Sequence, residues 1–188
     1  MEILDRKAFE ARLDEMLGEI KAGKLFIYPT DTIYGIGCDA TNRAAVERIR
    51  ALKKRDKKPF SVIAPSVRWI MLNCSVGQLE HKWIRRLPGP YTLVLRLSNG
   101  SAVSGAVNEN LATIGIRIPA KWFSGVVAHS DVPFVTTSVN VAGEPHMTSL
   151  SDLNPEIRDG VDYVIDSGEL KNKPSKVIDL DSGDPLRD

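Results

Sequence analysis

A short stretch of the sequence, residues 48–58, concentrates cationic side chains. It holds seven basic residues against one acid, a charge of +6, whereas the whole chain has 25 Lys and Arg against 24 Asp and Glu and a net charge of +1. The remainder of the chain therefore carries −5, which argues against a nucleic-acid binder with a generally basic surface. A local cluster of this kind indicates a site for an anion. The cluster comprises Arg48, Arg50, Lys53, Lys54, Arg55, Lys57 and Lys58.

Two interpretations of this basic cluster stay open. Cations near a helix C-terminus are favourable with the helix dipole, so the cluster is typical of a solvated helix end. Alternatively, it holds a nucleoside triphosphate, which brings about four negative charges. Transfer at phosphorus is catalysed mainly by positioning and by neutralising charge.

Hydroxyl-bearing segments follow two predicted strands. Residues 29–37 form a predicted polar, glycine-bearing loop, and residues 136–140 read Thr-Thr-Ser-Val-Asn at the end of a second strand. Open α/β sheets place ligands at such strand ends, and hydroxyl groups there suit a small polar ligand. The alternatives are an ordinary turn for the first segment and, for the second, a loop that satisfies its own backbone.

Arg117 alternates with isoleucines in an otherwise apolar strand. A buried guanidinium is costly unless it meets an anion. The carboxylate of a ligand, held bidentately, is one solution, and a salt bridge to an Asp or Glu is the other. Ser175 lies in a turn before the predicted last strand and offers a further anchoring hydroxyl.

Covalent and metal chemistry have little support in the sequence. Ser138 has no matched His and Asp, so we interpret it as a hydrogen-bonding residue. No Gly-Lys-Ser/Thr occurs, which excludes a Walker A loop, and the three histidines have no metal-ligand spacing. Cys38 and Cys74 are expected to be reduced thiols in a cytoplasmic protein. The apolar runs are too short to span a membrane, and the N-terminus lacks a signal core.

The elements that position these residues mix helices and strands throughout, which predicts one α/β domain over residues 1–188. The hairpin-like spacing between residues 91 and 118 predicts that part of the sheet is antiparallel. Periodicity and capping residues predict helices over 5–23, 45–52, 67–72, 76–87 and 122–127. Strands are predicted at 25–28, 60–64, 91–97, 112–118, 134–137, 161–165 and 177–180.

Six segments, taken in order, resemble the threonylcarbamoyl-AMP synthase family, the YrdC-like domain, from about residue 20 to the C-terminus. They are YPTDTIYGIGCDA at 28–40, K-x-R at Lys53 and Arg55 with Lys58-Pro59, PGPYT at 88–92, RIP at 117–119, S-x-N at Ser138 and Asn140 with Gly143, and PS at 174–175 before VID. The resemblance implies a twisted open mixed sheet with flanking helices and a concave basic cleft.

The implied reaction converts L-threonine, bicarbonate or CO₂, and ATP to threonylcarbamoyl-AMP and pyrophosphate, which makes the chain a nucleotidyltransferase. Mg²⁺ would arrive with ATP, since no carboxylate cage is evident. The product would pass to a separate tRNA threonylcarbamoyltransferase for t⁶A synthesis. By resemblance, the catalytic residues are Lys53 and Arg55, the ATP-binding residues are Lys53, Arg55, Lys58, Thr113, Ser138 and Asn140, and the L-threonine-binding residues are Thr32, Arg117 and Ser175.

The chain departs from the family pattern at two places: Lys176 stands where many members have Thr, and residues 60–64 lack a histidine that some members carry. Lys176 and Arg187 receive no role. One alternative function is an RNA-binding or ribosome-assembly module with a basic concave face, against which the 6% aromatic content argues. Another is a carbamoyl-adenylate former that uses carbamoyl phosphate. Weak binding of tRNA or double-stranded RNA at the site stays open.

Overall fold

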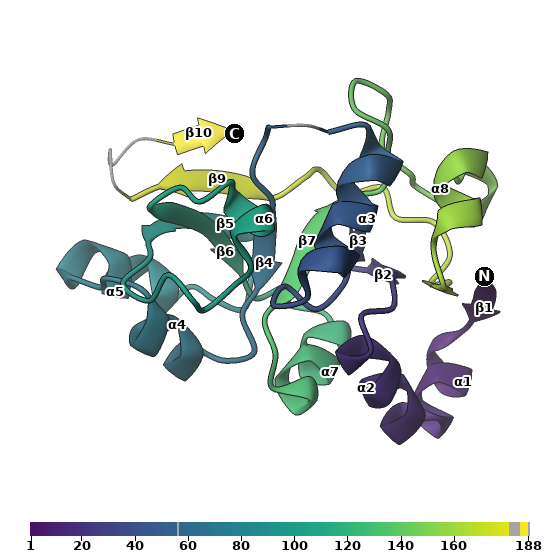
Figure 1. Cartoon of the computed structure of the whole chain (residues 1–188), viewed down its shortest axis with the longest axis horizontal. Helices are drawn as coiled ribbons and strands as arrows, with labels where there is room; N and C mark the ends of the chain where they lie inside the picture. Colours follow the sequence, from purple (N-terminus) through teal and green to yellow (C-terminus); the bar gives the residue numbers. More distant parts are fainter. Residues whose placement is uncertain (56, 181–184, 188) are drawn as a thin grey trace.

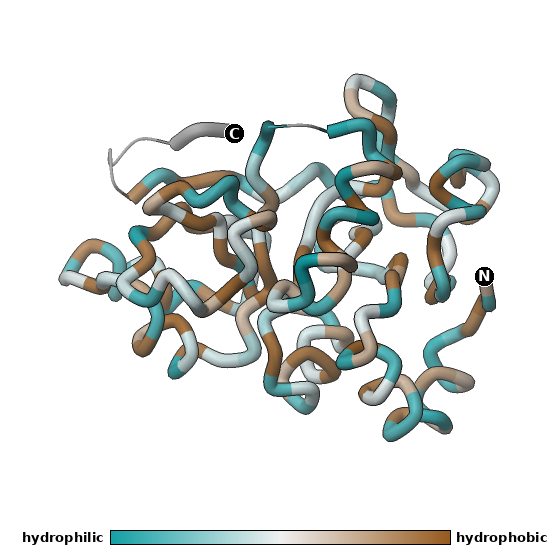
Figure 2. The backbone as a smooth tube through the Cα atoms, in the orientation of Figure 1, coloured by the Kyte–Doolittle hydropathy of each residue, from teal (hydrophilic) through white to brown (hydrophobic). Residues whose placement is uncertain are grey.

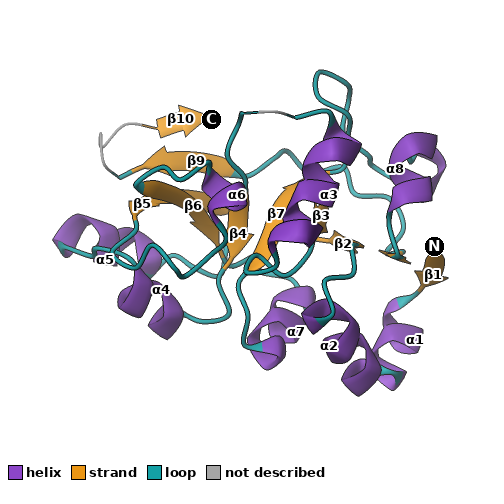
Figure 3. Cartoon of the chain, viewed as in Figure 1, coloured by secondary structure: helices purple, strands orange, loops and turns teal. Residues whose placement is uncertain are grey.

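The chain folds around one mixed β-sheet that helices flank (Figures 1 and 3). The computed structural model describes residues 1–55, 57–180 and 185–187. Within these, the strand order is β1-β8-β2-β3-β7-β4-β6-β5-β9-β10. The strands are β1 (Glu2–Leu4), β2 (Phe26–Pro29), β3 (Tyr34–Gly37), β4 (Ser61–Ile63), β5 (Tyr91–Arg96), β6 (Thr113–Arg117), β7 (Phe134–Ser138), β8 (Tyr163–Ile165), β9 (Lys176–Asp179) and β10 (Pro185–Arg187).

The helices occupy both faces of this sheet. They are α1 (Arg6–Ala11), α2 (Leu13–Lys21), α3 (Arg43–Lys53), α4 (Val67–Asn73), α5 (Gln78–Ile84), α6 (Gly105–Asn108), α7 (Phe123–Ser130) and α8 (Pro155–Gly160), with a 3₁₀ turn at Leu150–Asp152. In the described part of the chain, no helix combines the length and the apolar character that crossing a bilayer requires. Asp56, the one acid of the basic cluster, and the side chain of Arg187 lie outside what the structure describes.

The predicted fold class is confirmed: the sheet is open and mixed. Antiparallel pairing of β5 with β6 confirms the expectation drawn from the spacing of residues 91–118, while β4 with β6 and β5 with β9 are parallel. The seven predicted strands correspond to β2 and β4–β9. The predicted helix over 5–23 is wrong in one respect, because it is two helices that meet at Arg12, whose backbone leaves helical geometry. The short elements β1, β10, α6 and α8 were not predicted, since three to six residues carry too little periodicity.

The prediction that residues 29–37 form one loop is also wrong. Residues 34–37 are strand β3, which forms a hairpin with β2 and also pairs with β7, so only residues 30–33 turn. The glycines of this segment suggested a flexible loop, but Gly35 and Gly37 instead allow neighbouring groups to pack closely against the backbone of β3. A Cβ on Gly35 would lie 2.9 Å from the Tyr28 ring, and one on Gly37 would collide with the carbonyl oxygen of Val135.

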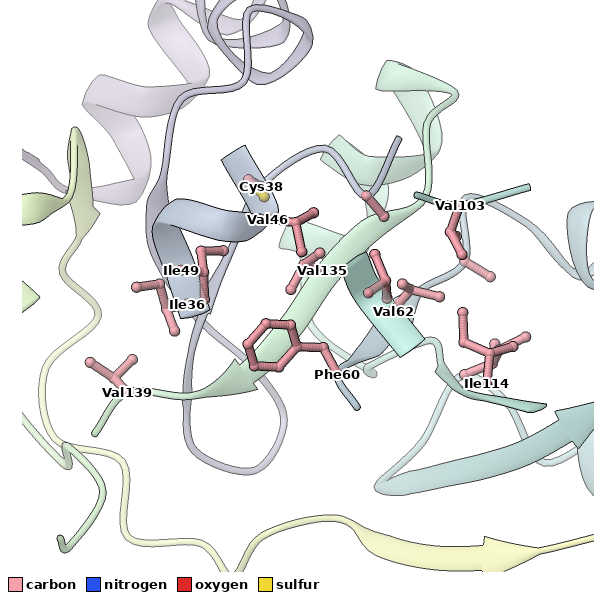
Figure 4. Packing of buried hydrophobic residues seen from close by; sticks show 14 of the residues in the cluster. Ile36, Cys38, Val46, Ile49, Phe60, Val62, Val103, Ile114, Val135 and Val139 are labelled. Atoms are coloured by element: carbon pink, nitrogen blue, oxygen red, sulfur yellow. The ribbon is translucent and has the colours of Figure 1, made fainter. Parts of the chain in front are cut away.

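Each face of the sheet has its own apolar cluster. One packs β-strand residues such as Val62 and Val135 under α3, where Val46 and Ile49 contact them (Figure 4). The other joins the sheet to α1, α2 and α7 through an aromatic group that includes Phe9, Phe26, Tyr28, Phe123 and Phe134. The hydropathy colouring in Figure 2 shows brown segments along the central strands and teal at the outer turns.

Along the second face, single strands change from apolar to polar. On β4, Ile63 belongs to the aromatic cluster, whereas Ser61, two residues earlier on the same face, does not. The neighbouring strand β7 shows the same change from apolar to polar, because Phe134 opposes Ile63 and Thr136 opposes Ser61. On the other side of β4, Gly115 of β6 opposes Ser61. The sheet therefore supplies core packing at one end of this face and a floor of small polar residues at the other.

Close packing at Gly37 makes a stability prediction. We expect Gly37→Ala to lower the free energy of unfolding by about 1–3 kcal/mol, because the new methyl group meets the backbone of β7, which cannot move cheaply. Urea denaturation measures the change. The matched control is Gly18→Ala in α2, where a Cβ has open space, and it should raise stability by about 0.5–1 kcal/mol. A neutral Gly37→Ala would contradict the close approach.

Candidate active site

A pocket of about 160 Å³ opens over the polar end of this sheet face. Its wall combines two arginines, Arg55 and Arg117, with a majority of small and hydroxyl residues, and no described Asp or Glu lines it. The cavity is smaller than the 300–1,000 Å³ usual for a drug-sized ligand, so a nucleotide would extend past it. The hydroxyl-bearing lining residues from Ser and Thr are Thr30, Ser61, Thr92, Thr136, Thr137, Ser138 and Ser175.

Arg117 lines the pocket and is 6% exposed. Its Nη2 donates to Asp31 Oδ1 at 2.7 Å and to Thr32 Oγ1 at 3.3 Å. The salt-bridge interpretation is therefore confirmed, and the Asp31 carboxylate also accepts from the backbone N–H of Ala120. The pair does not use the whole guanidinium, because Nε of Arg117 is buried without a hydrogen-bond partner in the structure. This buried donor therefore has no acceptor among the described residues.

Burial lowers the pKa of Arg117 below its ordinary value, and the Asp31 charge opposes this. An arginine stays protonated under such a shift, so the guanidinium keeps its positive charge, which the Asp31 carboxylate balances. Thr32, predicted to bind threonine, lies beside this charge, 2% exposed, and its hydroxyl also meets that of Thr30 at 2.9 Å. Thr30 lines the pocket, whereas Thr32 is not among the lining residues.

Arg55 lines the same pocket at a second place. Its guanidinium donates to the carbonyl oxygens of Pro59 at 2.8 Å and Lys58 at 3.2 Å, contacts Thr137 Oγ1 at 3.4 Å, and lies 5.1 Å from the centre of the Phe60 ring. Pro59 precedes β4, whereas Arg117 pairs with Ile63 at the end of β4. The two cations are therefore separated along the strand, with hydroxyl groups between them.

The rest of the basic cluster does not gather into one anion site. Three of its members form ion pairs with acids of other elements: Arg48 with Asp162, Arg50 with Glu109 and Lys54 with Glu156. Arg50 additionally caps carbonyl oxygens of α6. Lys57 and Lys58 are exposed, and their side chains do not line the pocket. Of the seven cations in the cluster, three thus form ion pairs with described acids, Lys57 and Lys58 face solvent, Lys53 is buried, and Arg55 lines the pocket.

Lys53, predicted to be catalytic, is the last residue of α3 and is only 1% exposed. Its Nζ donates to the backbone oxygens of Ser138 and Asn140 and to Asn140 Oδ1. Burial and the nearby Arg55 guanidinium lower the pKa of Lys53 to about 7. Three acceptors nevertheless require three N–H donors, which only the protonated form has. Lys53 is not among the residues that line the pocket.

The S-x-N pair forms a small network with this lysine. Ser138 Oγ donates to Asn140 Oδ1 at 2.6 Å, and Asn140 Nδ2 donates to the carbonyl oxygen of Glu144 at 2.8 Å. Ser138 lines the pocket, while Asn140 lines a neighbouring depression with Glu144, His146 and Asp152. Ser138 and Asn140, both predicted to bind ATP, are therefore in contact, but Ser138 lines the pocket and Asn140 lines the neighbouring depression.

Ser175 closes one side of the pocket. Its hydroxyl meets that of Thr92 at 2.8 Å, and Asn172, three residues earlier, donates to the backbone oxygen of Asp31 at 3.1 Å. Thr113, predicted to bind ATP, begins β6 and is not among the lining residues. Sequence reasoning gave no role to Asp31 or Thr92. The only signal for either was its place inside a family-like segment.

No described group of three or more His, Cys, Asp or Glu side chains could hold a metal ion. The Asp31 carboxylate, which pairs with the pocket residue Arg117, also accepts a hydrogen bond from the backbone N–H of Ala120. The described residues therefore offer no carboxylate cage of their own for a metal ion.

Comparison with known proteins identifies the family. The family model Sua5_yciO_yrdC, described as telomere recombination, matches residues 19–187. A putative threonylcarbamoyl-AMP synthase of Methanocaldococcus jannaschii is 36% identical over 172 residues, which cover 90% of this chain and 80% of the relative. The chain belongs to the Sua5/YciO/YrdC family of threonylcarbamoyl-AMP synthases. These enzymes are nucleotidyltransferases, and the resemblance drawn from the motifs is confirmed.

Further members support this Sua5/YciO/YrdC assignment. The threonylcarbamoyl-AMP synthase of Xanthomonas axonopodis pv. citri is 32% identical over 186 residues, covering 94% of this chain and 97% of that one. The crystal structure of Pyrococcus abyssi Sua5 complexed with L-threonine has a TM-score of 0.86 at 29% identity, covering 98% of this chain and 56% of that chain. Escherichia coli YciO shares the fold, with a TM-score of 0.83 at 23% identity, covering 99% and 92%.

The buried Arg117–Asp31 pair makes a second prediction. We expect Asp31→Ala to cost about 3–5 kcal/mol in urea denaturation, because it leaves a buried guanidinium without its counter-charge. The control is Glu10→Ala, which breaks the exposed Arg6–Glu10 pair and should cost less than about 1 kcal/mol. Equal effects of the two substitutions would show that Arg117 does not depend on Asp31.

Proposed function

We propose that this chain forms threonylcarbamoyl-AMP and pyrophosphate from L-threonine, bicarbonate or CO₂, and ATP. The observation that supports this most directly is the pocket with a cation at each of two places, Arg117 inside and Arg55 beside β4, joined by a wall of hydroxyl groups. Such a pocket suits a ligand that is anionic at both ends and polar between them. A threonine carboxylate and an ATP phosphate, joined through a carbamate, have this character.

Arg117 takes the threonine carboxylate in this proposal. Its unpartnered Nε is the donor that the carboxylate would satisfy, which removes the cost of a buried N–H without an acceptor. Thr32 accepts a hydrogen bond from the guanidinium, and Ser175, paired with Thr92 on the strand next to that of Arg117, offers its hydroxyl. The fixed charge of Arg117 thereby orients the amine of threonine toward the open part of the pocket.

Arg55 takes the phosphates, with Ser138 and Asn140 on the adjoining wall and Lys58 and Thr113 farther out as predicted contacts. Mg²⁺ enters as part of the Mg–ATP substrate and needs no carboxylate cage. The guanidinium neutralises charge that grows on the departing pyrophosphate, which is the main contribution a protein makes to transfer at phosphorus.

The chemistry needs no protein nucleophile. The amine nitrogen of threonine forms a bond to the carbon of CO₂ and loses a proton, giving a carbamate. A carbamate oxygen, already anionic, then attacks the α-phosphorus of ATP, and the bond from that phosphorus to the bridging oxygen breaks as pyrophosphate leaves. We place the reaction in the cytoplasm, where the product would pass to a separate tRNA threonylcarbamoyltransferase.

Pyrophosphate release tests this proposal. With Mg–ATP present, we expect release to require both L-threonine and bicarbonate, because the attacking carbamate forms from the two. The assay measures pyrophosphate with each substrate omitted in turn. Release at the same rate without threonine would contradict the proposed reaction, as would a requirement for carbamoyl phosphate in place of threonine.

A substitution separates the two ends of the site. We expect Arg55→Met to raise the KM for ATP about tenfold or more while the KM for threonine changes little, because a charge-assisted contact to phosphate is lost. The matched control is Lys54→Met, which changes an exposed neighbour paired with Glu156 and should leave both constants unaltered. An unchanged ATP constant in Arg55→Met would remove Arg55 from the phosphate site.

A further inference from the structure

Lys53 ties the end of α3 to the segment 138–142 through four hydrogen bonds. Three run from its Nζ to the backbone oxygens of Ser138 and Asn140 and to Asn140 Oδ1. The fourth runs in the other direction, because the carbonyl oxygen of Lys53 accepts from the N–H of Ala142 at 3.0 Å. A helix end and a strand-end loop that lie 85 residues apart in the sequence are thereby held as one unit.

The ammonium group has no donor left over for a ligand. A lysine carries three N–H donors, and the three acceptors around Nζ use all of them. The side chain is 1% exposed and lies outside the lining of the pocket, whereas Arg55 and Ser138 are part of that lining. A phosphate could reach Nζ only if the segment 138–142 first gave up its contacts.

The effect of Lys53 passes to the pocket through Asn140. Oδ1 of Asn140 accepts from both Lys53 Nζ and Ser138 Oγ, and its Nδ2 donates to Glu144 O. The ammonium therefore sets which way the amide faces, since Oδ1 must point at the two donors. The hydroxyl proton of Ser138 is then committed to Asn140, and its oxygen is presented to the pocket as an acceptor.

We propose that Lys53 is a positioning residue, whose buried ammonium holds the segment 138–142 in the shape that presents Ser138 to the nucleotide, and that it makes no contact with phosphate. The inference rests on the proposed use of ATP and changes the predicted role of the K-x-R lysine. In this assignment Arg55 of the K-x-R motif contacts the phosphates, and Lys53 holds the segment 138–142 that lines the pocket beside them.

The test uses nucleotides that differ in the number of phosphates. Binding of ATP, ADP and AMP is measured by calorimetry for the native chain, Lys53→Met and Arg55→Met. A positioning role predicts that Lys53→Met weakens all three nucleotides by a similar factor, about tenfold, because the wall is disturbed for each. Arg55→Met should weaken ATP more than AMP. A loss in Lys53→Met that grows with the number of phosphates would overturn the proposal.

A charge-conserving variant keeps the test decisive if Lys53→Met folds poorly. Lys53→Arg retains the cation but cannot place three N–H groups on the same three acceptors from one atom. The proposal predicts that it loses nucleotide affinity, whereas a phosphate ligand would keep most of it. Retained affinity for ATP in Lys53→Arg would overturn the positioning role.

Hydrogen exchange supplies a readout that does not depend on the reaction. The amide of Ala142 should exchange faster in Lys53→Met and in Lys53→Arg, and at the native rate in Arg55→Met and in the control Lys54→Met. Unchanged protection of Ala142 in the Lys53 variants would overturn the proposal even if nucleotide binding fell. If the native chain does not use ATP with threonine, the proposed function fails. The exchange result would still show whether Lys53 holds the segment 138–142 in place.

Discussion

A buried ion pair, Arg117 with Asp31, lies where the apolar half of one sheet face meets the polar half. The desolvation of a guanidinium in such a position is offset only by a well-placed counter-charge and hydrogen bonds. Asp31 supplies the charge from the β2–β3 turn, and Thr32 adds a hydroxyl from the same turn. The geometry of that turn, and through Asn172 the position of the segment that carries Ser175, depends on this pair.

The floor of the pocket is formed by the same sheet face that carries the aromatic cluster, at the end where the side chains are small. Where β4 and β7 change from Ile63 and Phe134 to Ser61 and Thr136, the aromatic packing stops and space appears. Gly115 adds no side chain beside Ser61. The fold therefore needs no separate ligand-binding module, because core and site are successive positions on the same strands.

The sequence predicted much of the fold and part of the pocket lining, but not how the charges are arranged. The strands were predicted because their pattern of apolar and β-branched residues is local. The family-like motifs named Arg55, Arg117, Ser138 and Ser175, all of which the structure brings to one pocket. Local charge could not show that Arg48, Arg50 and Lys54 find acids from distant elements, since those contacts depend on tertiary packing. For the same reason, an isolated lysine run gave no sign that Lys53 would be buried. The glycines of residues 29–37 predicted a loop because the sequence does not distinguish a glycine that must bend from one that must pack closely.

The central claim is that the unpartnered Nε of Arg117 is reserved for the carboxylate of L-threonine. Nuclear magnetic resonance of the ¹⁵N-labelled chain can follow the Arg117 Nε–H signal directly. The account predicts that this signal moves downfield and exchanges more slowly with solvent when L-threonine is added, and that L-threoninamide, which lacks the carboxylate, leaves it in place. An Arg117 Nε–H signal that stays unchanged when the chain is saturated with L-threonine would contradict the account.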